Sequence, residues 1–416
     1  MAESVTDICK RAAEAAPGIA RLNRVTKDAA LAAMANALQD SAGVLVDANS
    51  KDLAVATEEG TSGSLLDRLT LTPARLGSMA DGLRAVAAQN DPVGEVVIGW
   101  RRPNGLLIEQ VRAPLGVVGV IYEARPNVTS DVAGLCLKSG NTCVLRGSSI
   151  ALNSNRAIVE VLRAALHSAG VDDDALQLVP DAGRAAALEL MRAKGYVDLL
   201  VPRGGPALIK SIEDNATVPF IIDGDGNCHI YIDAAAGEAM ATEIVVNAKT
   251  QRPSVCNAME TLLVHEAMAG AWLTGALDSL ADEGVEIRGD ERVVEAWPKA
   301  TAATDDDWAT EYLDLVLAVK VVDSFDEAIL HINTFGTANA EGIVTNDLAA
   351  ARRFAAEVDA GSVFINASTR FSDGGEFGYG AEIGISTQKL HARGPMGLTA
   401  LTSTKYVVWG EGQIRP

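Results

Sequence analysis

Short apolar segments of strand length alternate with alanine-rich helical segments through the middle of the chain. The strand candidates in this region are GVVGVIY (116–122), NTCVLRG (141–147), LQLVP (176–180), VDLLVP (197–202) and VPFII (218–222). Helical segments at 153–169 and 183–194 lie between them. This alternation predicts an α/β fold with a parallel, doubly wound sheet. Right-handed crossovers in such a sheet bring the carboxyl ends of the strands to one edge, where ligands bind.

The flanking regions add helices, a hairpin and a second α/β series. Residues 1–90 read as helices, because apolar residues keep helical spacing in segments such as KDAALAAMANALQD (27–40). Residues 95–111 predict two strands around Pro103-Asn-Gly105, which is a hairpin signal. The later strand candidates are METLLVH (259–265), GVEI (284–287), LDLVLAV (313–319), AEGIVT (340–345), GSVFIN (361–366) and TKYVVWG (404–410).

The charge balance argues against polyanionic partners. The 416 residues include 35 basic and 55 acidic side chains, which gives a net charge of −20 and a pI near 4.7. Nucleic acids and anionic membranes are bound by clustered positive charge, so neither partner is expected. An acidic protein also repels small anions, and an anionic substrate would therefore require local arginines.

The cysteine pattern and the lack of sorting signals predict a cytoplasmic protein with free thiols. Residues 1–16 have no apolar core of a signal peptide, and no stretch approaches the roughly 18 apolar residues of a membrane span. The odd, scattered set of cysteines is not a disulfide framework. No metal site is expected either, since there is no CxxC pair, HEAMA (265–269) lacks a second histidine, and DGDGNC (223–228) lacks the glycine of a calcium loop.

Cys256 is the cysteine whose surroundings favour chemistry. It lies in a polar, proline-broken loop, QRPSVCNAMET (251–261), just before an apolar strand. Lys249 and Arg252 nearby would favour the thiolate, which is the reactive form. The alternative is that Cys256 is a small buried hydrophobic residue, the usual environment of a free cysteine. Cys136 and Cys143 have apolar neighbours and are expected to be structural.

Two glycine-rich segments are candidate ligand sites. PRGGP (202–206) follows a strand and opens a helix, whose free N–H groups suit a phosphate. GGEFGYG (374–380) indicates a flexible segment near a ligand, and Arg370 and Arg393 flank it with guanidinium groups suited to carboxylate or phosphate. An ordinary strand-to-helix turn, a surface loop and solvated arginines are the alternatives.

Taken together, a series of blocks in the same order resembles the γ-glutamyl phosphate reductase family (glutamate-5-semialdehyde dehydrogenases) of the aldehyde dehydrogenase superfamily. The blocks are DANSKDL (47–53), LLDRLTLT (65–72), DPVG (91–94), APLGVVGVIYEARPNVTSDVAGLCLKSGNTCVLRG (113–147), VPRGG (201–205), NAKTQRPSVCNAMETLLVH (247–265), INASTRF (365–371) and EIGISTQKLHARGPMGL (382–398). Most are weak signals individually, but their combination over nearly the whole chain is specific.

The resemblance implies an aldehyde dehydrogenase-like fold in three parts. A Rossmann-type NADPH-binding domain would comprise residues 1–94 and 115–245, and an α/β catalytic domain residues 246–370. Residues 95–114 and 371–416 would form a small β oligomerisation flap and a C-terminal active-site loop. The family reduces L-glutamyl 5-phosphate with NADPH to glutamate 5-semialdehyde and phosphate, in the second step of proline biosynthesis. The resemblance also implies a homo-oligomer, and it leaves open direct transfer of the labile substrate from a glutamate 5-kinase.

Catalytic and cofactor-binding roles carry over by resemblance. Cys256 matches the catalytic cysteine, and Asn127 matches the asparagine that forms the oxyanion hole with the cysteine's own N–H. Arg146 falls where related enzymes place a lysine on the adenosine ribose, and it would suit the 2′-phosphate of NADPH. The VPRGG turn, with Arg203, Gly204 and Gly205, matches the segment under the cofactor pyrophosphate. Glu311 matches the glutamate that binds the nicotinamide ribose.

Four arginines lie in blocks peculiar to the family, and the resemblance implies that some bind the phosphate and carboxylate of the substrate. They are Arg125, Arg252, Arg370 and Arg393. Because the chain as a whole is acidic, these arginines together with Arg146 and Arg203 are predicted to converge on one cleft.

A thioester that is reduced rather than hydrolysed is the expected intermediate. Hydrolytic relatives carry a glutamate base in an ELGGK block, whereas the matching stretch here reads IIDGDGNCH (221–229). Asp223 lies near that position and stays open as a weak base. Two other functions remain: an acylating aldehyde dehydrogenase acting on another activated acyl group such as acyl-CoA, or a non-catalytic oligomeric binding protein of the same fold.

Overall fold

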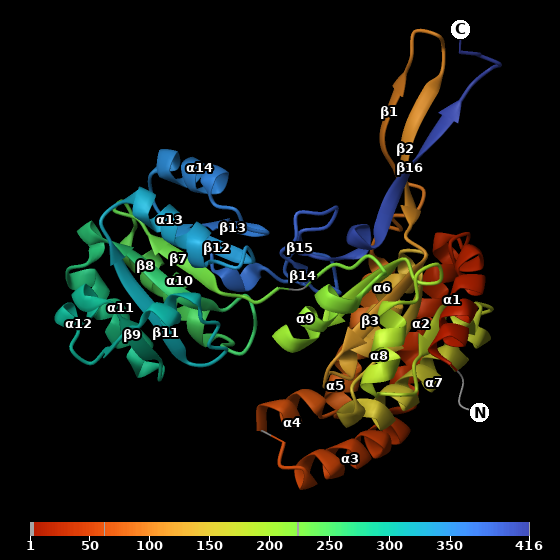
Figure 1. Ribbon diagram of the computed structural model, residues 1–416, viewed down its shortest axis with the longest axis horizontal. Helices are drawn as coiled ribbons and strands as arrows, with labels where there is room; N and C mark the ends of the chain where they lie inside the picture. The colour runs from red at the N-terminus through yellow and green to blue at the C-terminus, as the bar shows by residue number, and fades with distance from the viewer. Residues whose placement is uncertain (1–3, 62, 223, 416) are drawn as a thin grey trace. The chain divides into compact units, whose positions relative to one another are not determined.

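The computed structural model describes residues 4–61, 63–222 and 224–415, and its chain divides into two compact units (Figure 1). The first unit comprises Met1–Ile222, Gly378–Gly384 and Met396–Pro416. The second unit comprises Asp223–Phe377 and Ile385–Pro395. Each unit has its own parallel sheet with helices packed against it, so the α/β class predicted from the strand–helix alternation is confirmed.

A four-stranded parallel sheet with the order β5-β4-β3-β6 forms the centre of the first unit. Its strands are β3 (Val117–Tyr122), β4 (Thr142–Arg146), β5 (Leu176–Leu178) and β6 (Leu199–Arg203). Every residue of β3 is buried, as expected for a strand covered by helices on both faces. The strand expected at 218–222 is reduced to a bridge between Leu200 and Phe220, since Pro219 has no N–H with which to extend the pairing.

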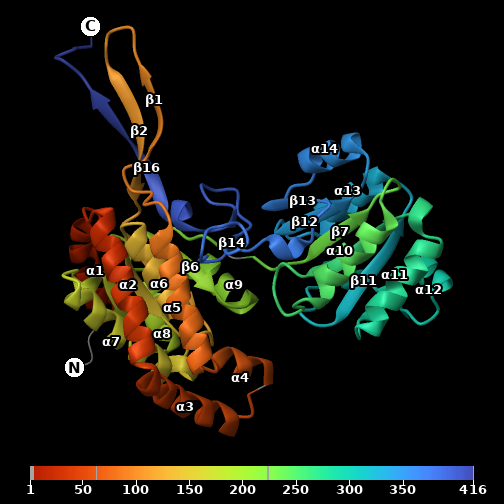
Figure 2. The ribbon, with the colours of Figure 1, turned by 180° about the vertical axis from the view of Figure 1, so that it is seen from behind.

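Helices surround this sheet (Figure 2). They are α1 (Val5–Ile19), α2 (Arg24–Asp40), α3 (Ala42–Glu58), α4 (Gly63–Leu69), α5 (Pro73–Ala88), α6 (Asn127–Lys138), α7 (Leu152–Ser168), α8 (Arg184–Met191) and α9 (Pro206–Asn215). The side chains of Ser4, Asn23 and Thr72 cap α1, α2 and α5 by accepting hydrogen bonds from first-turn N–H groups. Within the described residues, no single helix is long and apolar enough to cross a membrane. The bent pair α2 and α3, with 67° between the two helices, reaches that length and composition only when the two are taken together.

An antiparallel three-stranded sheet also belongs to the first unit. It consists of β1 (Val96–Arg101), β2 (Leu107–Pro114) and β16 (Thr402–Trp409), with β2 in the middle. The hairpin predicted around Pro103-Asn-Gly105 is therefore confirmed, as is its association with the last strand. Trp100 and Tyr406 meet edge to face across this sheet, with their ring centroids 6.3 Å apart.

The second unit contains a seven-stranded parallel sheet in the order β10-β9-β11-β8-β7-β12-β13. The strands are β7 (Cys228–Ile232), β8 (Met259–His265), β9 (Glu286–Gly289), β10 (Thr301–Ala302), β11 (Val316–Val322), β12 (Ala340–Val344) and β13 (Ser362–Ile365). The helices are α10 (Glu238–Thr250), α11 (Ala271–Asp282), α12 (Glu291–Ala296), α13 (Phe325–Phe335) and α14 (Leu348–Glu357). A short pair, β14 (Ile385–Ser386) and β15 (Gly394–Pro395), follows near the C-terminus.

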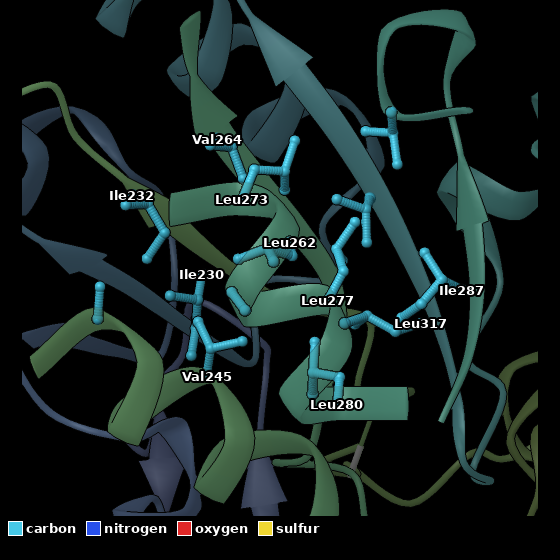
Figure 3. Close-up of a cluster of buried hydrophobic side chains, with 14 of the residues drawn as sticks. Ile230, Ile232, Val245, Leu262, Val264, Leu273, Leu277, Leu280, Ile287 and Leu317 are labelled. Atoms are coloured by element: carbon cyan, nitrogen blue, oxygen red, sulfur yellow. The ribbon is translucent and has the colours of Figure 1, made fainter. Parts of the chain in front are cut away.

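Side chains that alternate along the strands build a core on each face of this sheet. Ile230 and Leu262 point to the face covered by α10 and α11, where they pack with residues such as Val245 and Leu277 (Figure 3). Tyr231, which lies between two residues of the first cluster, packs on the opposite face against α13 and α14. The central strands are therefore packed on both faces of the sheet.

The division of the chain differs from the one predicted from the sequence. The sequence placed the end of the cofactor domain at residue 245 and the end of the catalytic domain at residue 370. In the structure, β7 pairs with β8 and β12, so residues from 223 onward belong to the second unit. Residues 371–377 and 385–395 also belong to the second unit. The boundary moves because a strand belongs to the sheet in which its neighbours lie.

Candidate functional site

Cys256 lies in the loop between α10 and β8, and this loop is packed against the segment that leads into β7. Gly226 touches its backbone so closely that a Cβ atom at position 226 would lie 1.7 Å from the Cys256 carbonyl oxygen. The buried thiol of Cys228 donates a hydrogen bond to the same carbonyl, with a Sγ–O distance of 3.1 Å. The side-chain amide of Asn227 donates to the Trp308 and Phe335 carbonyls and thereby anchors the segment.

A second segment, residues 369–373, holds the other side of the Cys256 loop. Asn257, which follows Cys256, donates from Nδ2 to the Ser372 carbonyl at 2.9 Å. The Thr369 hydroxyl donates to the Asn257 carbonyl at 2.8 Å. Arg370 donates from Nε to Gln251 Oε1 at 2.9 Å. The Cys256 loop is therefore fixed by segments that precede it and follow it in sequence.

Two predicted substrate arginines lie in the neighbourhood of Cys256. Burial lowers the pKa of Arg370, and the positive charge of Arg252 lowers it further. Asp373, Cys256 and Cys228 act on the pKa of Arg370 in the opposite direction. Arg370 thus interacts electrostatically with both Arg252 and Cys256, and a positive charge near a thiol favours its thiolate form.

Cys256 differs from the other cysteines in its exposure. It is half-buried, whereas Cys9, Cys136, Cys143 and Cys228 are buried. Burial raises the pKa of Cys9 to about 12 and also raises that of Cys228 well above the ordinary thiol value. Cys256 is therefore the thiol that reagents and substrates can reach, in agreement with the reading of its loop.

Lys249 does not have the environment that its position in the sequence indicated. Its ammonium group is buried and pairs with Glu260 at 2.6 Å. Burial lowers the pKa of Lys249, while burial raises the pKa of Glu260 to about 7. Lys249 is therefore engaged in a buried ion pair and is not free to act on Cys256 as the sequence indicated.

Glu311 and Arg393 have different surroundings within the second unit. Glu311 accepts a hydrogen bond from the Gly226 N–H at 2.8 Å, which places it next to the segment supporting Cys256. Arg393 donates from Nη2 to Asp359 at 2.8 Å, and Lys389 pairs with the same carboxylate. The role of Glu311 on the nicotinamide ribose and that of Arg393 on the substrate stay predictions.

The first unit places Arg146 and Arg203 at one edge of its sheet. Arg146 ends β4, Arg203 ends β6, and both strands flank β3, whose residues Ile121 and Tyr122 are their partners in register. Arg146 donates from Nη2 to the Ala182 and Gly183 carbonyls, and burial lowers its pKa. This is the carboxyl edge of a parallel sheet, where the sequence predicted the cofactor.

The turn after β6 has the features of a phosphate site. Gly205 caps α9, and no atom lies within 4 Å of the position that its Cβ would take. At Gly204, by contrast, a Cβ would lie 2.8 Å from the Glu123 carboxyl carbon. The two glycines therefore have different roles. Gly204 allows the backbone to pack closely against Glu123, and Gly205 leaves space for a ligand at the N-terminus of α9.

Asn127 is the first residue of α6 and is exposed. Its Nδ2 donates to Asp131 Oδ2 at 3.0 Å, so one of its two amide hydrogens is already directed. Burial raises the pKa of Asp131 to about 6, although Asn127 and Arg203 oppose the rise. Arg125 lies just before this helix, and its backbone N–H donates to the Glu123 carbonyl.

Six arginines were predicted to converge on one cleft, and the structure supports this for one pair of arginines in each unit. Arg146 and Arg203 share the sheet edge in the first unit, and Arg252 and Arg370 share the Cys256 neighbourhood in the second. Arg393 instead pairs with Asp359. Convergence of the whole set on a single cleft stays a prediction.

Several supporting residues were not recognised in the sequence. Gly226 and Cys228 lie in DGDGNC, which was considered as an incomplete calcium loop and as the counterpart of the ELGGK block but not as a support for Cys256. Thr369 and Ser372 carried no signal of their own. Asp223, left open as a weak base, lies outside the described residues. Among those that are described, no group of three or more His, Cys, Asp or Glu residues could hold a metal ion.

Comparison with known proteins identifies the family of enzymes to which the chain belongs. The sequence model of the aldehyde dehydrogenase family matches residues 1–288 and 303–407, so the chain belongs to this family. An acetylating aldehyde dehydrogenase from Geobacillus thermoglucosidasius, 18% identical with a TM-score of 0.70 over 99% of this chain and 97% of its own, shares the fold. The family implies a nicotinamide cofactor.

Closer relatives define the branch. A γ-glutamyl phosphate reductase from Thermobifida fusca is 56% identical over 99% of this chain and 98% of its own. A second, from Moorella thermoacetica, is 55% identical over 98% of this chain and 97% of its own. The crystal structure of the γ-glutamyl phosphate reductase from Thermotoga maritima covers 100% of both chains at 45% identity, with a TM-score of 0.97. Within its family, the chain is therefore an oxidoreductase of the γ-glutamyl phosphate reductase branch.

Proposed function

We propose that this protein reduces L-glutamyl 5-phosphate to L-glutamate 5-semialdehyde with NADPH, releasing phosphate in the second step of proline biosynthesis. One observation carries the proposal beyond the resemblance: the half-buried Cys256 lies in a loop fixed from both sides, Arg252 belongs to that loop, and Arg370 is hydrogen-bonded to it through Gln251. A nucleophile with two cations suits a substrate that combines an acyl group with phosphate and carboxylate.

The first chemical step is an attack by Cys256. The thiolate adds to the acyl phosphate carbonyl, the oxyanion is stabilised by Asn127 and the cysteine N–H, and phosphate leaves as the thioester forms. Preorganised donors of this kind are often worth about 3 kcal/mol. Phosphate is a good leaving group, so the step needs little acid assistance. Asp131 contributes by directing one hydrogen of the Asn127 amide.

The residues at the β4–β3–β6 edge fit a dinucleotide phosphate. The open Gly205 and the N-terminus of α9 offer backbone N–H groups to the pyrophosphate, and Arg203 ends the preceding strand. Arg146 offers a guanidinium to a 2′-phosphate, which supports NADPH over NADH. Glu311 is assigned to the nicotinamide ribose. When bound, NADPH supplies the hydride that converts the thioester into the aldehyde.

Productive reduction requires that water does not hydrolyse the thioester. Two buried carboxylates among the described residues of the second unit are engaged with other groups. Glu260 pairs with Lys249, and Glu341 accepts from the His229 backbone N–H at 2.6 Å. The departure of IIDGDGNCH (221–229) from the ELGGK block of hydrolytic relatives supports release of the acyl group by hydride rather than by water.

The reverse reaction distinguishes the proposed function from the alternatives, an acylating aldehyde dehydrogenase acting on acyl-CoA and a non-catalytic binding protein. Purified protein is mixed with glutamate semialdehyde and NADP, with either phosphate or CoA as the acceptor, and NADPH absorbance is followed. We expect NADPH to form with phosphate and not with CoA. Formation with CoA alone would support an acylating dehydrogenase of another substrate class, and no NADPH with either acceptor would indicate a non-catalytic protein.

We infer that the three-stranded sheet joins copies of the chain into a homo-oligomer. Its outer strands expose Val96, Ile98, Val408 and Trp409, and such apolar exposure is typical of an interface. Replacement of Val408 and Ile98 with lysine is expected to reduce the mass measured by light scattering to that of a monomer. A parent protein that is already monomeric at working concentration would contradict this inference.

We also place the protein in the cytoplasm, with a glutamate 5-kinase supplying the labile acyl phosphate. This location follows from the free thiols and from the chemistry of a substrate that cannot persist in water. Co-purification of tagged protein with a kinase activity on glutamate, and its recovery in the soluble cytoplasmic fraction, would test both points.

A further inference from the structure

The proposed substrate carries a group for which the site has no assigned partner. Arginines account for its phosphate and α-carboxylate, but L-glutamyl 5-phosphate and its aldehyde product also bear an α-ammonium group. Only a short methylene chain separates this cation from the carbonyl that Cys256 attacks, so its partner must lie close to the Cys256 loop. A carboxylate is the side chain that discriminates for an ammonium group.

Asp373 lies in the segment that contacts the Cys256 loop. The preceding residue, Ser372, accepts the 2.9 Å hydrogen bond from Asn257, which is next to Cys256. Ser372 is also buried, and its hydroxyl donates a hydrogen bond to the Ser362 hydroxyl at 3.2 Å. The backbone at this point is therefore anchored to β13. Asp373 is thus one residue away from a direct contact with the nucleophile loop.

The carboxylate of Asp373 is oriented by its own turn. Its Oδ1 accepts hydrogen bonds from the Gly375 N–H at 2.8 Å and, more weakly, from the Glu376 N–H at 3.4 Å. These donors are neutral backbone groups, which orient the carboxylate without cancelling its charge. Asp373 also interacts electrostatically with Arg370, the arginine that interacts with Cys256. An anion and a cation thus interact within the segment that borders the Cys256 loop, as recognition of an amino acid requires.

Other carboxylates near Cys256 are less suitable. Glu260 is neutralised by Lys249, and Glu341 is buried against His229. Glu311 accepts from Gly226 and is assigned to the cofactor. Among the described carboxylates of this segment, Asp225, an exposed neighbour of Gly226, is the rival that the experiment must separate from Asp373. We propose that Asp373 binds the α-ammonium group of the substrate and selects amino-acid aldehydes over aldehydes that lack the amino group; this rests on the proposed function.

The test compares two aldehydes in the reverse reaction with phosphate and NADP. One is L-glutamate 5-semialdehyde, and the other is 5-oxopentanoate, the same chain without the amino group. For Asp373→Asn we expect kcat/KM with the amino aldehyde to fall about 10- to 100-fold, the range for a lost hydrogen bond to a charged group. The value with 5-oxopentanoate should be unchanged, which also shows that the variant is folded.

Two further variants make the result specific. Glu376→Gln removes the same charge from the same turn and should leave the preference between the aldehydes as in the parent. A loss of preference in Asp225→Asn but not in Asp373→Asn would overturn the assignment in favour of the rival. Equal loss on both aldehydes in Asp373→Asn would also overturn it, because the carboxylate would then only support the loop. A parent inactive with the amino aldehyde would instead refute the proposed function.

Discussion

Replacement of Cys256 with alanine is expected to reduce kcat/KM for NADPH formation from glutamate semialdehyde, phosphate and NADP by about 10⁴-fold or more, as removal of a catalytic nucleophile does in other enzymes. The reason is that no thiohemiacetal, and hence no thioester, can form. Of the five cysteines Cys256 is the one that is only half-buried, and it interacts electrostatically with Arg370. Initial rates over a range of aldehyde concentrations measure the effect.

The buried cysteines provide the control for this experiment. Cys9→Ala removes a thiol from the core of the first unit and should retain the parent turnover, with a lower melting temperature. Iodoacetamide followed by mass spectrometry should modify Cys256 first in the parent. Activity of Cys256→Ala close to that of the parent, or faster alkylation of Cys9, would contradict the assignment of the nucleophile.

Substitution of alanine for Gly226 is expected to reduce the rate strongly as well, although Gly226 has no reactive side chain. The new Cβ would lie 1.7 Å from the carbonyl oxygen of Cys256 and 2.5 Å from its Cα, so the backbone of the nucleophile loop must move. Misplacement of reacting groups by about 1 Å can cost about 100-fold in rate. Overpacking of this kind typically lowers the free energy of unfolding by about 1–3 kcal/mol.

A glycine elsewhere in the second unit separates crowding from the substitution itself. Gly275 lies in α11, and no atom is within 4 Å of the position of its Cβ. Gly275→Ala should therefore keep full activity and gain stability of up to about 1 kcal/mol from helix propensity. Chemical denaturation and the reverse assay report the two effects. A Gly226→Ala variant with parental kcat would show that the loop can relax away.

The local patterns of the sequence were sufficient for most elements but not for the limits of the units. The buried run of β3 and the Pro103-Asn-Gly105 hairpin were identified because periodicity and turn residues act over a few positions. The assignment of β7 to the second sheet depends on pairing with β8 and β12, which lie far along the chain. No local pattern carries that information, and the predicted boundary at 245 was therefore too late.

The same distinction holds for the candidate site. Cys256, Arg252 and Arg370 were selected by their chemistry and by family blocks, and the structure brings them together in one unit. The contacts of Ser372 with Asn257 and of Gly226 with Cys256 join segments that are distant in sequence, so they were not foreseen. Lys249 shows the opposite case, since a nearby cation in the sequence proved to be neutralised by Glu260 in the core.

The pairing of β16 with β2 has a consequence for biosynthesis. Trp409 Nε1 donates to Glu109 Oε2 across 300 positions of sequence, so β2 acquires its second neighbour only when the C-terminal strand has been made. At translation rates of about 5–20 residues per second, the hairpin waits for some tens of seconds with the edge of β2 unpaired. An open edge is a template for unwanted pairing, so this interval is when the nascent chain most needs protection by chaperones.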